Sequence, residues 1–431
     1  MDQLPGIAVE ALFAPAVRRA ARPGPVSRPG VVSRPVAVDR PGPVSRHGEP
    51  GRAAGGGRRP VVCLYTPSAD PSGMGGHMID LAAEYVRQLD VTMMAWPTPA
   101  GVRLLELAAA VGARPVALPH PRDPGFGNAV AHDLRMHPVD VFHVHVGTGR
   151  ENFDGARAAG CAGVPAVLQT LHLPWQMGSR KHRVPFFAAI EPVDRLVAVS
   201  ELQRRSYERI GVPAERFVTV PNGIRTRAGG PGRAAARAAL GLHPAARVVL
   251  TVGRLLHYKG QRHLIDAVPD LAARFPDLAV VVLGDGPLHR ALTEQAAALG
   301  VADRVHLPGF RPDARLLLDA ADVFVLPSRQ EAMPLAALEA MDAGLPVVAS
   351  RVFGSAEVVV DGTTGLLVRP GDPRALGCAV AELLDDPERA RRCGAAGRQR
   401  YLEHYSSARM AAQTLAVYRA VLARSPARGS G

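Results

Sequence analysis

Four charged side chains in the second half of the chain have the types and the spacing of a substrate-binding site. Arg254 and Lys259 lie five residues apart directly after an apolar run, whereas Glu331 and Glu339 lie eight residues apart across a predicted helix start. Two cations suit a diphosphate, and two carboxylates suit the hydroxyl groups of two sugars. A nucleotide sugar contains both parts, so these four residues predict a site for one.

Lysine is rare in this chain, which draws attention to Lys259. Lys181 and Lys259 are its only lysines, although lysine and arginine together number 51. An ammonium group is a compact charge on a flexible stem, whereas a guanidinium group is a flat fork. The presence of lysine at position 259 therefore indicates that this compact charge is needed there. The alternative is that the lysine is present by chance.

The helix predicted from Pro334 to Ala343 suits an anion. Proline fits the first position of a helix, and Gly344 fits the position just past its end. The first N–H groups of a helix attract negative charge, and because Pro334 has no N–H, we expect Leu335 and Ala336 to donate to a phosphate. Glu339 lies one turn further on the same face, where it can accept hydrogen bonds from ribose hydroxyls. We also expect Gly253 and Met333 to contact this ligand.

The elements that must position these residues alternate between strands and helices. This alternation predicts a parallel sheet built from βαβ units, and it occurs twice along the chain. The first set of apolar strand candidates covers 61–65, 91–95, 139–146, 166–171 and 196–200, and the second covers 248–252, 278–283, 305–307, 323–326, 347–349 and 365–368. Helices are predicted at 261–275, 288–299 and 314–320, and a last helical run at 401–423.

The predicted fold class is therefore α/β, with two doubly wound Rossmann-like domains that face a cleft. In such sheets ligands bind at the carboxyl ends of the strands. The expected organisation is a tail over residues 1–57, an acceptor-binding domain over 58–224, a linker over 225–245, a donor-binding domain over 246–400 and the helix 401–423 packing back toward the first domain. The tail repeats the motif RPGPVSR and is rich in Pro, Gly and Arg, a composition that predicts disorder.

Composition limits the classes of partner and compartment. No apolar run reaches the ~20 residues that cross a bilayer, the start of the chain lacks the pattern of a signal peptide, and the four cysteines lack metal-binding spacing. These features predict a cytoplasmic protein.

The net charge of +12 favours anionic partners, but aromatic residues make up only 5% of the chain, so nucleic acid is not expected. Peripheral contact with an anionic membrane at its inner face stays open.

From about Pro60 to Leu422 the chain resembles the retaining GT-B glycosyltransferases of family 4. The motifs that carry the resemblance are GRLLHYKG at 253–260, the two glutamates eight apart, GDGP at 284–287, DGTTGLLV at 361–368 and PNGI at 221–224. Many family members have glycine after the first glutamate, where this chain has Ala332. The resemblance implies that Arg254 and Lys259 hold the diphosphate, that Glu331 holds the transferred sugar and that Glu339 holds the ribose.

The N-terminal half should supply the acceptor site. Gly75 and Gly76 follow a predicted strand, where backbone N–H groups can approach the donor phosphate. The resemblance also implies a histidine that touches the donor sugar, and we favour His145 over His143 because it lies nearer the end of its strand. We expect three further residues to contact the acceptor: His77, His172 and Lys181.

These expectations predict a retaining transferase that moves a sugar from a nucleotide-sugar donor, with a UDP-sugar favoured, to an acceptor hydroxyl. Asp313 lies where the base should stack and could pair with guanine, so a GDP-mannose-dependent mannosyltransferase is an alternative. The acceptor is either a lipid or polysaccharide or a small polyol or aminocyclitol. Neither a metal nor a cofactor is expected. A sugar-nucleotide epimerase and a non-catalytic binding protein are the rivals from other classes.

Overall fold

The computed structural model describes residues 58–69, 72–120, 122–147, 154–174 and 180–424, and of Ser72 and residues 180–182 only the backbone. The tail predicted over residues 1–57 lies outside this part of the chain. Within it, no helix is both long enough and apolar enough to cross a membrane.

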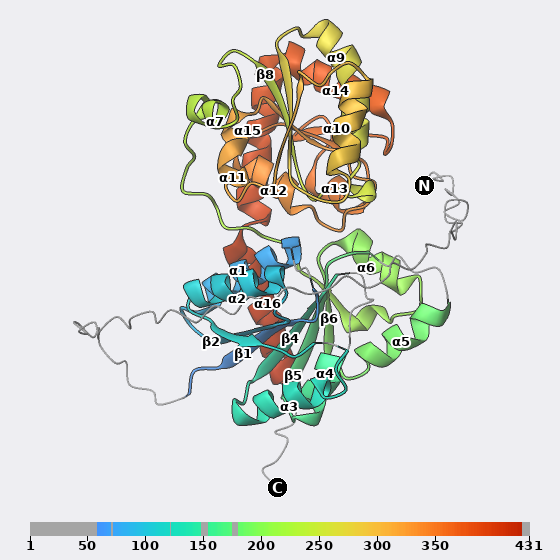
Figure 1. The fold of residues 1–431 in the computed structure, drawn as a ribbon. Coiled ribbons are helices and arrows are strands. Elements are labelled where there is room, and N and C mark those ends of the chain that lie inside the picture. The colour runs from blue at the N-terminus through green and yellow to red at the C-terminus, as the bar shows by residue number, and fades with distance from the viewer. Residues whose placement is uncertain (1–57, 70–71, 121, 148–153, 175–179, 425–431) are drawn as a thin grey trace, which may run out of the picture. The chain divides into compact units, whose positions relative to one another are not determined.

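The first half of the described chain forms a parallel sheet of seven strands in the order β3-β2-β1-β4-β5-β6-β7 (Figure 1). The strands are β1 (Val61–Thr66), β2 (Asp90–Ala95), β3 (Arg114–Ala117), β4 (Val141–Val146), β5 (Ala166–Leu171), β6 (Arg195–Ala198) and β7 (Phe217–Thr219). The helices between them are α1 (Ser72–Tyr85), α2 (Pro99–Ala110), α3 (Phe126–Met136), α4 (Asp154–Cys161), α5 (Arg180–Ile190) and α6 (Glu201–Glu208).

The second half forms a parallel sheet of six strands in the order β10-β9-β8-β11-β12-β13. These strands are β8 (Arg247–Val252), β9 (Leu278–Leu283), β10 (Val305–Gly309), β11 (Val323–Leu326), β12 (Val347–Ser350) and β13 (Gly365–Val368). The helices associated with them are α7 (Arg233–Ala239), η3 (His257–Lys259), α8 (Gln261–Asp266), α9 (Val268–Arg274), α10 (His289–Ala298), α11 (Ala314–Leu317), α12 (Leu335–Asp342), α13 (Phe353–Val358), α14 (Pro373–Asp385) and α15 (Pro387–His404).

Both sheets are buried on their two faces, which explains the continuous apolar runs of their strands. Every residue of β5 and of β9 is buried, and a separate hydrophobic core covers each face of each sheet. The strand order reverses once in each sheet, between β1 and β4 and between β8 and β11. Ligands of doubly wound sheets bind at such points, so the predicted α/β fold is confirmed and each half has one such position.

The helical run predicted at 401–423 consists of two helices. Helix α15 ends at His404, and α16 spans Ser407–Leu422. The break arises because Ile224 takes the backbone hydrogen bonds at this point: its N–H donates to Tyr405 O at 3.0 Å, and Ser407 N donates to Ile224 O at 2.8 Å. Helix α16 then packs on the first sheet, where Met410 and Tyr418 share a hydrophobic core with β1 and α1.

Two other predictions need correction. Gly75 and Gly76 lie inside α1 and not in a loop before it. The helix predicted at 261–275 is divided into α8 and α9 at Ala267, because Pro269 has no N–H to donate to the preceding turn. The edge strands β3 and β7 had no predicted counterpart, since short edge strands lack a continuous apolar run.

Candidate functional site

The loop after β8 carries both predicted diphosphate-binding cations. Arg254 is exposed shortly after the strand ends, and Lys259 closes the short helix η3. The next residue, Gly260, has φ +70°, and a Cβ atom there would lie 2.1 Å from the carbonyl oxygen of Pro327. Only glycine allows this close approach, which brings Lys259 against the loop that follows β11.

Lys259 and Glu331 form an ion pair, although 72 residues separate them. The Lys259 Nζ atom lies 2.8 Å from Oε1 of Glu331, and the hydroxyl of Ser328 donates to the same oxygen at 2.7 Å. Glu331 is buried, and Lys259 is partly exposed. Burial works against the ammonium ion, but the carboxylate of Glu331 outweighs it and raises the pKa of Lys259. The lysine is therefore charged across the physiological range.

The start of α12 has the expected N–H groups, with one correction to its boundary. Pro334 is the residue before the helix, with φ −78° and ψ 108°, and the helix begins at Leu335. The first helical hydrogen bond runs from Ala337 N to Pro334 O at 3.1 Å. The N–H groups of Leu335 and Ala336 precede this bond, so they have no acceptor within the helix. They are available to an anion.

Glu339 lies one turn into α12 among three charged neighbours that the motifs did not indicate. Its Oε1 atom lies 3.7 Å from Nε of Arg315, and Arg315 also contacts the buried carboxylate of Asp342 at 3.1 Å. Burial raises the pKa of the Glu339 carboxyl to about 7; Arg315 lowers it, whereas Asp80 and Asp342 raise it further. Near neutral pH this carboxyl therefore exists in both protonation states.

The GDGP turn supports the loop that carries Arg254. A Cβ atom on Gly284 would lie 2.0 Å from the carbonyl oxygen of Gly253, and Leu255 N donates to Asp285 O at 2.9 Å. The glycine is therefore needed for two backbones to touch. Gly253 lies in this contact, directly before Arg254.

Asp313 and Met333 already have partners in the protein. Both carboxylate oxygens of Asp313 accept from Arg311, at 2.8 and 2.7 Å, and this bonding lowers the pKa of Asp313. Met333 is buried; its sulfur lies 3.1 Å from Asn222 N, and its carbonyl oxygen accepts from the Asn222 side chain at 3.3 Å. Asn222 belongs to the PNGI motif, which was noted in the sequence without a role for this side chain.

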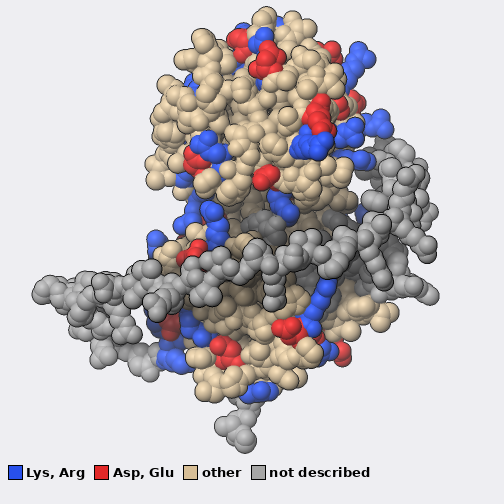
Figure 2. Space-filling model, viewed as in Figure 1, with Lys and Arg blue, Asp and Glu red and all other residues tan. Residues whose placement is uncertain are grey.

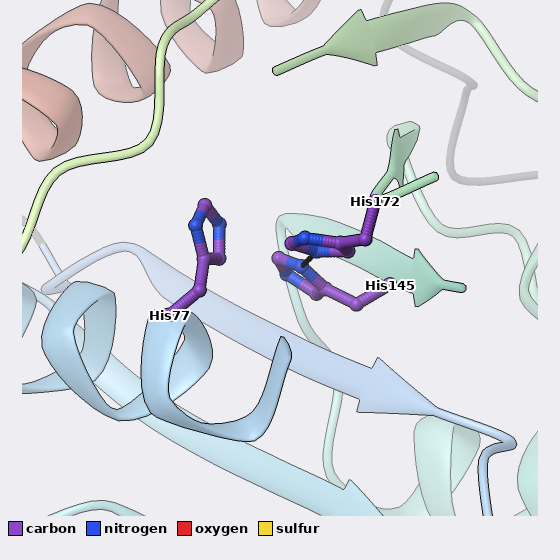
Figure 3. A group of neighbouring side chains, drawn as sticks. All are labelled: His77, His145 and His172. Atoms are coloured by element: carbon purple, nitrogen blue, oxygen red, sulfur yellow. Dashed lines mark hydrogen bonds between the residues drawn. The ribbon is translucent and has the colours of Figure 1, made fainter. Parts of the chain in front are cut away.

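Three histidines of the first half gather near the carboxyl ends of β4 and β5. His77 of α1, His145 of β4 and His172 just after β5 form one group (Figure 3). Nδ1 of His145 lies 3.2 Å from Nε2 of His172, and the ring centre of His77 lies 4.7 Å from that of His172. Burial lowers the pKa of His77 to about 4 and lowers those of His145 and His172 well below their ordinary value.

His143 differs from this group because both of its nitrogens are occupied. Nδ1 lies 2.6 Å from the hydroxyl of Tyr418 in α16, and Nε2 lies 2.7 Å from the hydroxyl of Thr170. These two bonds give His143 a structural environment, whereas His145 faces His77 and His172. Lys181 lies in α5, but its side chain is outside the described part of the chain.

Sequence reasoning missed Arg315, Asp80 and Ser328. Arg315 and Asp80 approach Glu339 only through the tertiary fold, whereas Ser328 lies three residues before Glu331 and contacts it locally. Two doubly wound parallel sheets, with cations and a helix start at the carboxyl ends of the second sheet's strands, define the GT-B class of glycosyltransferase.

Comparisons with known proteins agree with this class. Residues 71–228 match the model of Glycosyltransferase Family 4, and residues 232–400 match that of Glycosyl transferases group 1. The chain therefore belongs to the group 1, family 4 glycosyltransferases of GT-B fold and is an enzyme of that class.

Three relatives and one solved structure show how far the similarity extends. Alpha-maltose-1-phosphate synthase of Mycolicibacterium smegmatis is 34% identical, over 84% of this chain and 100% of that protein. A GDP-mannose-dependent alpha-(1-6)-phosphatidylinositol monomannoside mannosyltransferase of the same species is 34% identical, over 58% and 68%. D-inositol 3-phosphate glycosyltransferase of Nocardia farcinica is 40% identical, over 48% of each chain. The Anabaena protein HepE, solved with UDP, has the same fold, with a TM-score of 0.71 at 22% identity over 84% of this chain and all of that one.

Proposed function

We propose that this enzyme transfers a sugar from a nucleotide-sugar donor, a UDP-sugar in the favoured case, to an acceptor hydroxyl with retention of configuration. The observation that carries the proposal is the ion pair between Lys259 and the buried carboxylate of Glu331, which lies shortly before the start of α12. Leu335 and Glu339 are four residues apart, or about 6 Å along a helix axis. That spacing suits a diphosphate at the helix start and a ribose beside Glu339.

Each charged group then has a separate task. Arg254, Lys259 and the first N–H groups of α12 stabilise the charge that grows on the departing nucleoside diphosphate. Glu331 accepts hydrogen bonds from the transferred sugar, and Glu339 accepts them from the ribose. When the donor binds, Lys259 shares its contact between Glu331 and the diphosphate, which couples the sugar to the leaving group.

Retention follows if the acceptor oxygen attacks the anomeric carbon on the face from which the diphosphate leaves. The acceptor proton then passes to the departing diphosphate oxygen, so the protein does not need to supply a general base. Glu331 is a poor candidate for a covalent nucleophile, because Lys259 and Ser328 both donate to its Oε1 atom. A carboxylate oxygen held by two donors is less able to attack carbon.

The donor base is proposed as uracil. Both oxygens of Asp313 are bound by Arg311, so recognition of guanine by Asp313 would first break that pair. The UDP found in the structurally similar HepE supports the same choice. The name of the mannosyltransferase relative supports GDP-mannose as the second candidate donor.

The acceptor is proposed to bind residues 58–224, and the donor to bind residues 246–400. Net charge favours an anionic acceptor or surface. On the face drawn in Figure 2, basic and acidic side chains are interspersed and do not form one basic patch. The acceptor is proposed to be a small phosphorylated or polyhydroxylated molecule, and the enzyme is proposed to act in the cytoplasm.

The direct test is a panel of nucleotide sugars measured by calorimetry and by donor hydrolysis without acceptor. The expected result is saturable binding of UDP and of one UDP-sugar, slow release of that sugar, and a product with retained anomeric configuration once an acceptor is supplied. Formation of an epimeric sugar nucleotide without acceptor would identify an epimerase, and binding without turnover would identify a non-catalytic protein. Preference for GDP and GDP-mannose would replace the uracil assignment.

A further inference from the structure

Three histidines converge beside the first sheet: His77 from helix α1, His145 from strand β4 and His172 from the position just after β5. Each can contribute one ring nitrogen, and the three nitrogens all lie within 4.8 Å of one another (Figure 3). His77 and His145 are buried, and His172 is partly buried. The backbone of His172 is itself fixed, because its N–H donates to Val146 O at 2.9 Å.

This group is not a satisfied hydrogen-bond network. Nδ1 of His77 and Nε2 of His145 are buried and have no hydrogen-bond partner among the described residues, and the Asn222 side chain lies near His77. Nε2 is the nitrogen of His145 that does not face His172. Burying a polar atom without a hydrogen-bond partner destabilises the fold. The neighbouring His143 shows the contrast, since hydroxyl groups contact both of its nitrogens. The fold therefore leaves imidazole nitrogens without hydrogen-bond partners at one point beside the first sheet.

We propose that His77, His145 and His172 bind one divalent transition-metal ion, of which Zn²⁺ is the type. Zinc–nitrogen bonds of ~2.0–2.1 Å in a tetrahedron place the nitrogens about 3.4 Å apart. Nδ1 of His145 and Nε2 of His172 already lie 3.2 Å apart, and a His77 nitrogen lies within 4.8 Å of the nitrogens of the other two rings, so rotation of the His77 side chain would complete the set.

The donor chemistry selects the class of metal. Three imidazoles and no carboxylate suit Zn²⁺, Co²⁺, Ni²⁺ or Cu²⁺, whereas Mg²⁺ and Ca²⁺ require oxygen ligands. Three protein ligands also leave a fourth position for water or a hydroxyl group. The bound ion would hold α1 to the ends of β4 and β5. This inference does not rest on the donor residues of the second sheet, although His145 was also expected to touch the donor sugar.

The test uses the full chain without an affinity tag, since a histidine tag would bind the same ions. The protein is stripped with a chelator, dialysed and titrated with Co²⁺, followed by its visible absorption, and then with Zn²⁺ in competition. Metal content after equilibrium dialysis gives the stoichiometry. We expect one equivalent of metal per chain, a tetrahedral Co²⁺ spectrum and a rise in melting temperature on metal addition.

Single substitutions locate the ion. His77→Ala, His145→Ala and His172→Ala should each weaken Co²⁺ binding more than tenfold, because each removes one of three ligands. His132→Ala is the matched control, since His132 is exposed on α3, and it should bind as the wild type does. His→Gln variants of the same three positions, together with circular dichroism, separate loss of a ligand from loss of the fold.

Two results would overturn the inference. One is the absence of stoichiometric Co²⁺ or Zn²⁺ binding by the folded wild type, and the other is binding that survives all three substitutions. UDP calorimetry on the same samples keeps the two proposals apart. Metal binding without UDP affinity would reject only the donor assignment, and UDP affinity without metal binding would reject only the histidine site.

Discussion

Glu331 and Glu339 have identical side chains but different neighbours, which suits the different tasks proposed for them. Glu331 is bound by Lys259 and Ser328, whereas Glu339 lies beside Arg315 and two further carboxyl groups. The first lies in a direct ion pair, and the second has a pKa raised to about 7 by burial. Their roles should therefore separate in binding and turnover measurements.

Glu339→Ala should weaken the binding of UDP about 10- to 150-fold, because a charged hydrogen bond to the ribose contributes ~1.5–3 kcal/mol to binding. Glu331→Gln should bind UDP as tightly as the wild type or more tightly, since it releases Lys259 toward the diphosphate, while kcat with the donor falls by a comparable factor. Calorimetry and acceptor-free hydrolysis on both variants give the comparison. Equal losses of UDP affinity would show that the roles have been assigned wrongly.

The raised pKa of Glu339, about 7, predicts a pH dependence of stability. This carboxyl binds its proton more tightly in the folded chain than in the unfolded chain, where its pKa is ~4.3. Its contribution to stability is therefore complete below about pH 4 and is lost as the pH rises through 7. Glu339→Gln avoids that loss, so between pH 5 and pH 8 it should gain about 1–3 kcal/mol of stability over the wild type.

Thermal melting at the two pH values measures this gain. The matched control is Glu106→Gln, because Glu106 is exposed on α2, and its difference from the wild type should be the same at both values. A Glu339→Gln difference that does not change with pH would show that the carboxyl is not held in its protonated form.

At the scale of elements, the start of α12 offers a test of the proposed anion site. Pro334 already has the extended conformation preferred before a proline, and Leu335 is the first helical residue, where proline is tolerated. Leu335→Pro should therefore keep the helix and remove one N–H donor, which should weaken the binding of UDP about tenfold or more. Leu335→Ala removes the side chain but keeps the N–H, so calorimetry should find it near wild type. Equal weakening in both variants would assign the effect to the side chain.

Gly260 tests whether the loop after β8 must lie against the loop after β11. Gly260 and Gly241 have similar positive φ angles, +70° and +66°, but only a Cβ on Gly260 would meet another backbone, at 2.1 Å from Pro327 O. Gly241→Ala should lower the free energy of unfolding by ~1–2 kcal/mol, because alanine is strained in the left-handed conformation. Gly260→Ala should lower the free energy of unfolding by ~1–3 kcal/mol more than that. It should also weaken the binding of UDP, because Lys259 moves with its loop. Denaturant unfolding and calorimetry on both variants decide this, and equal costs would argue against a tight contact.

The same scale shows what the sequence can and cannot predict. The central strands were found from their apolar runs, because a parallel sheet buries both faces of each strand. Strand β3 was missed because its residues alternate between partly buried and exposed and include Pro115. Gly75 and Gly76 were expected in a loop, since glycine has a low helix propensity, but tertiary packing places them in α1.

The candidate site was predictable only where its residues lie close together in the chain. Arg254, Lys259 and the start of α12 follow from local spacing and helix chemistry. The ion pair between Lys259 and Glu331 spans 72 residues, and no rule of spacing links them. Arg315 reaches Glu339 from α11 by the fold alone. The three histidines likewise come from separate elements, so their convergence could not be read from the sequence.

For the whole molecule, each sheet has one reversal of strand order, and each reversal has a different set of chemical groups. Cations, helix N–H groups and carboxylates gather after β8 and β11, whereas imidazoles gather after β1, β4 and β5. Charged groups suit a diphosphate and sugar hydroxyls, and neutral imidazoles suit a transition metal. The chain thus separates the chemistry proposed for the donor from the chemistry proposed for a metal.

This separation predicts how the enzyme responds to a chelator. Arg254, Lys259 and the N–H groups of α12 provide the positive field at the diphosphate, so UDP affinity and acceptor-free hydrolysis should persist in excess EDTA. Chelation should lower only the melting temperature, by removing an ion from the histidines of the first sheet. Calorimetry, hydrolysis and melting on one chelated sample provide the three measurements, with Lys259→Ala as the control that loses UDP affinity whether or not chelator is present. Hydrolysis that EDTA abolishes and Mg²⁺ or Mn²⁺ restores would place a metal at the diphosphate and show that the assignment of these cations is incomplete.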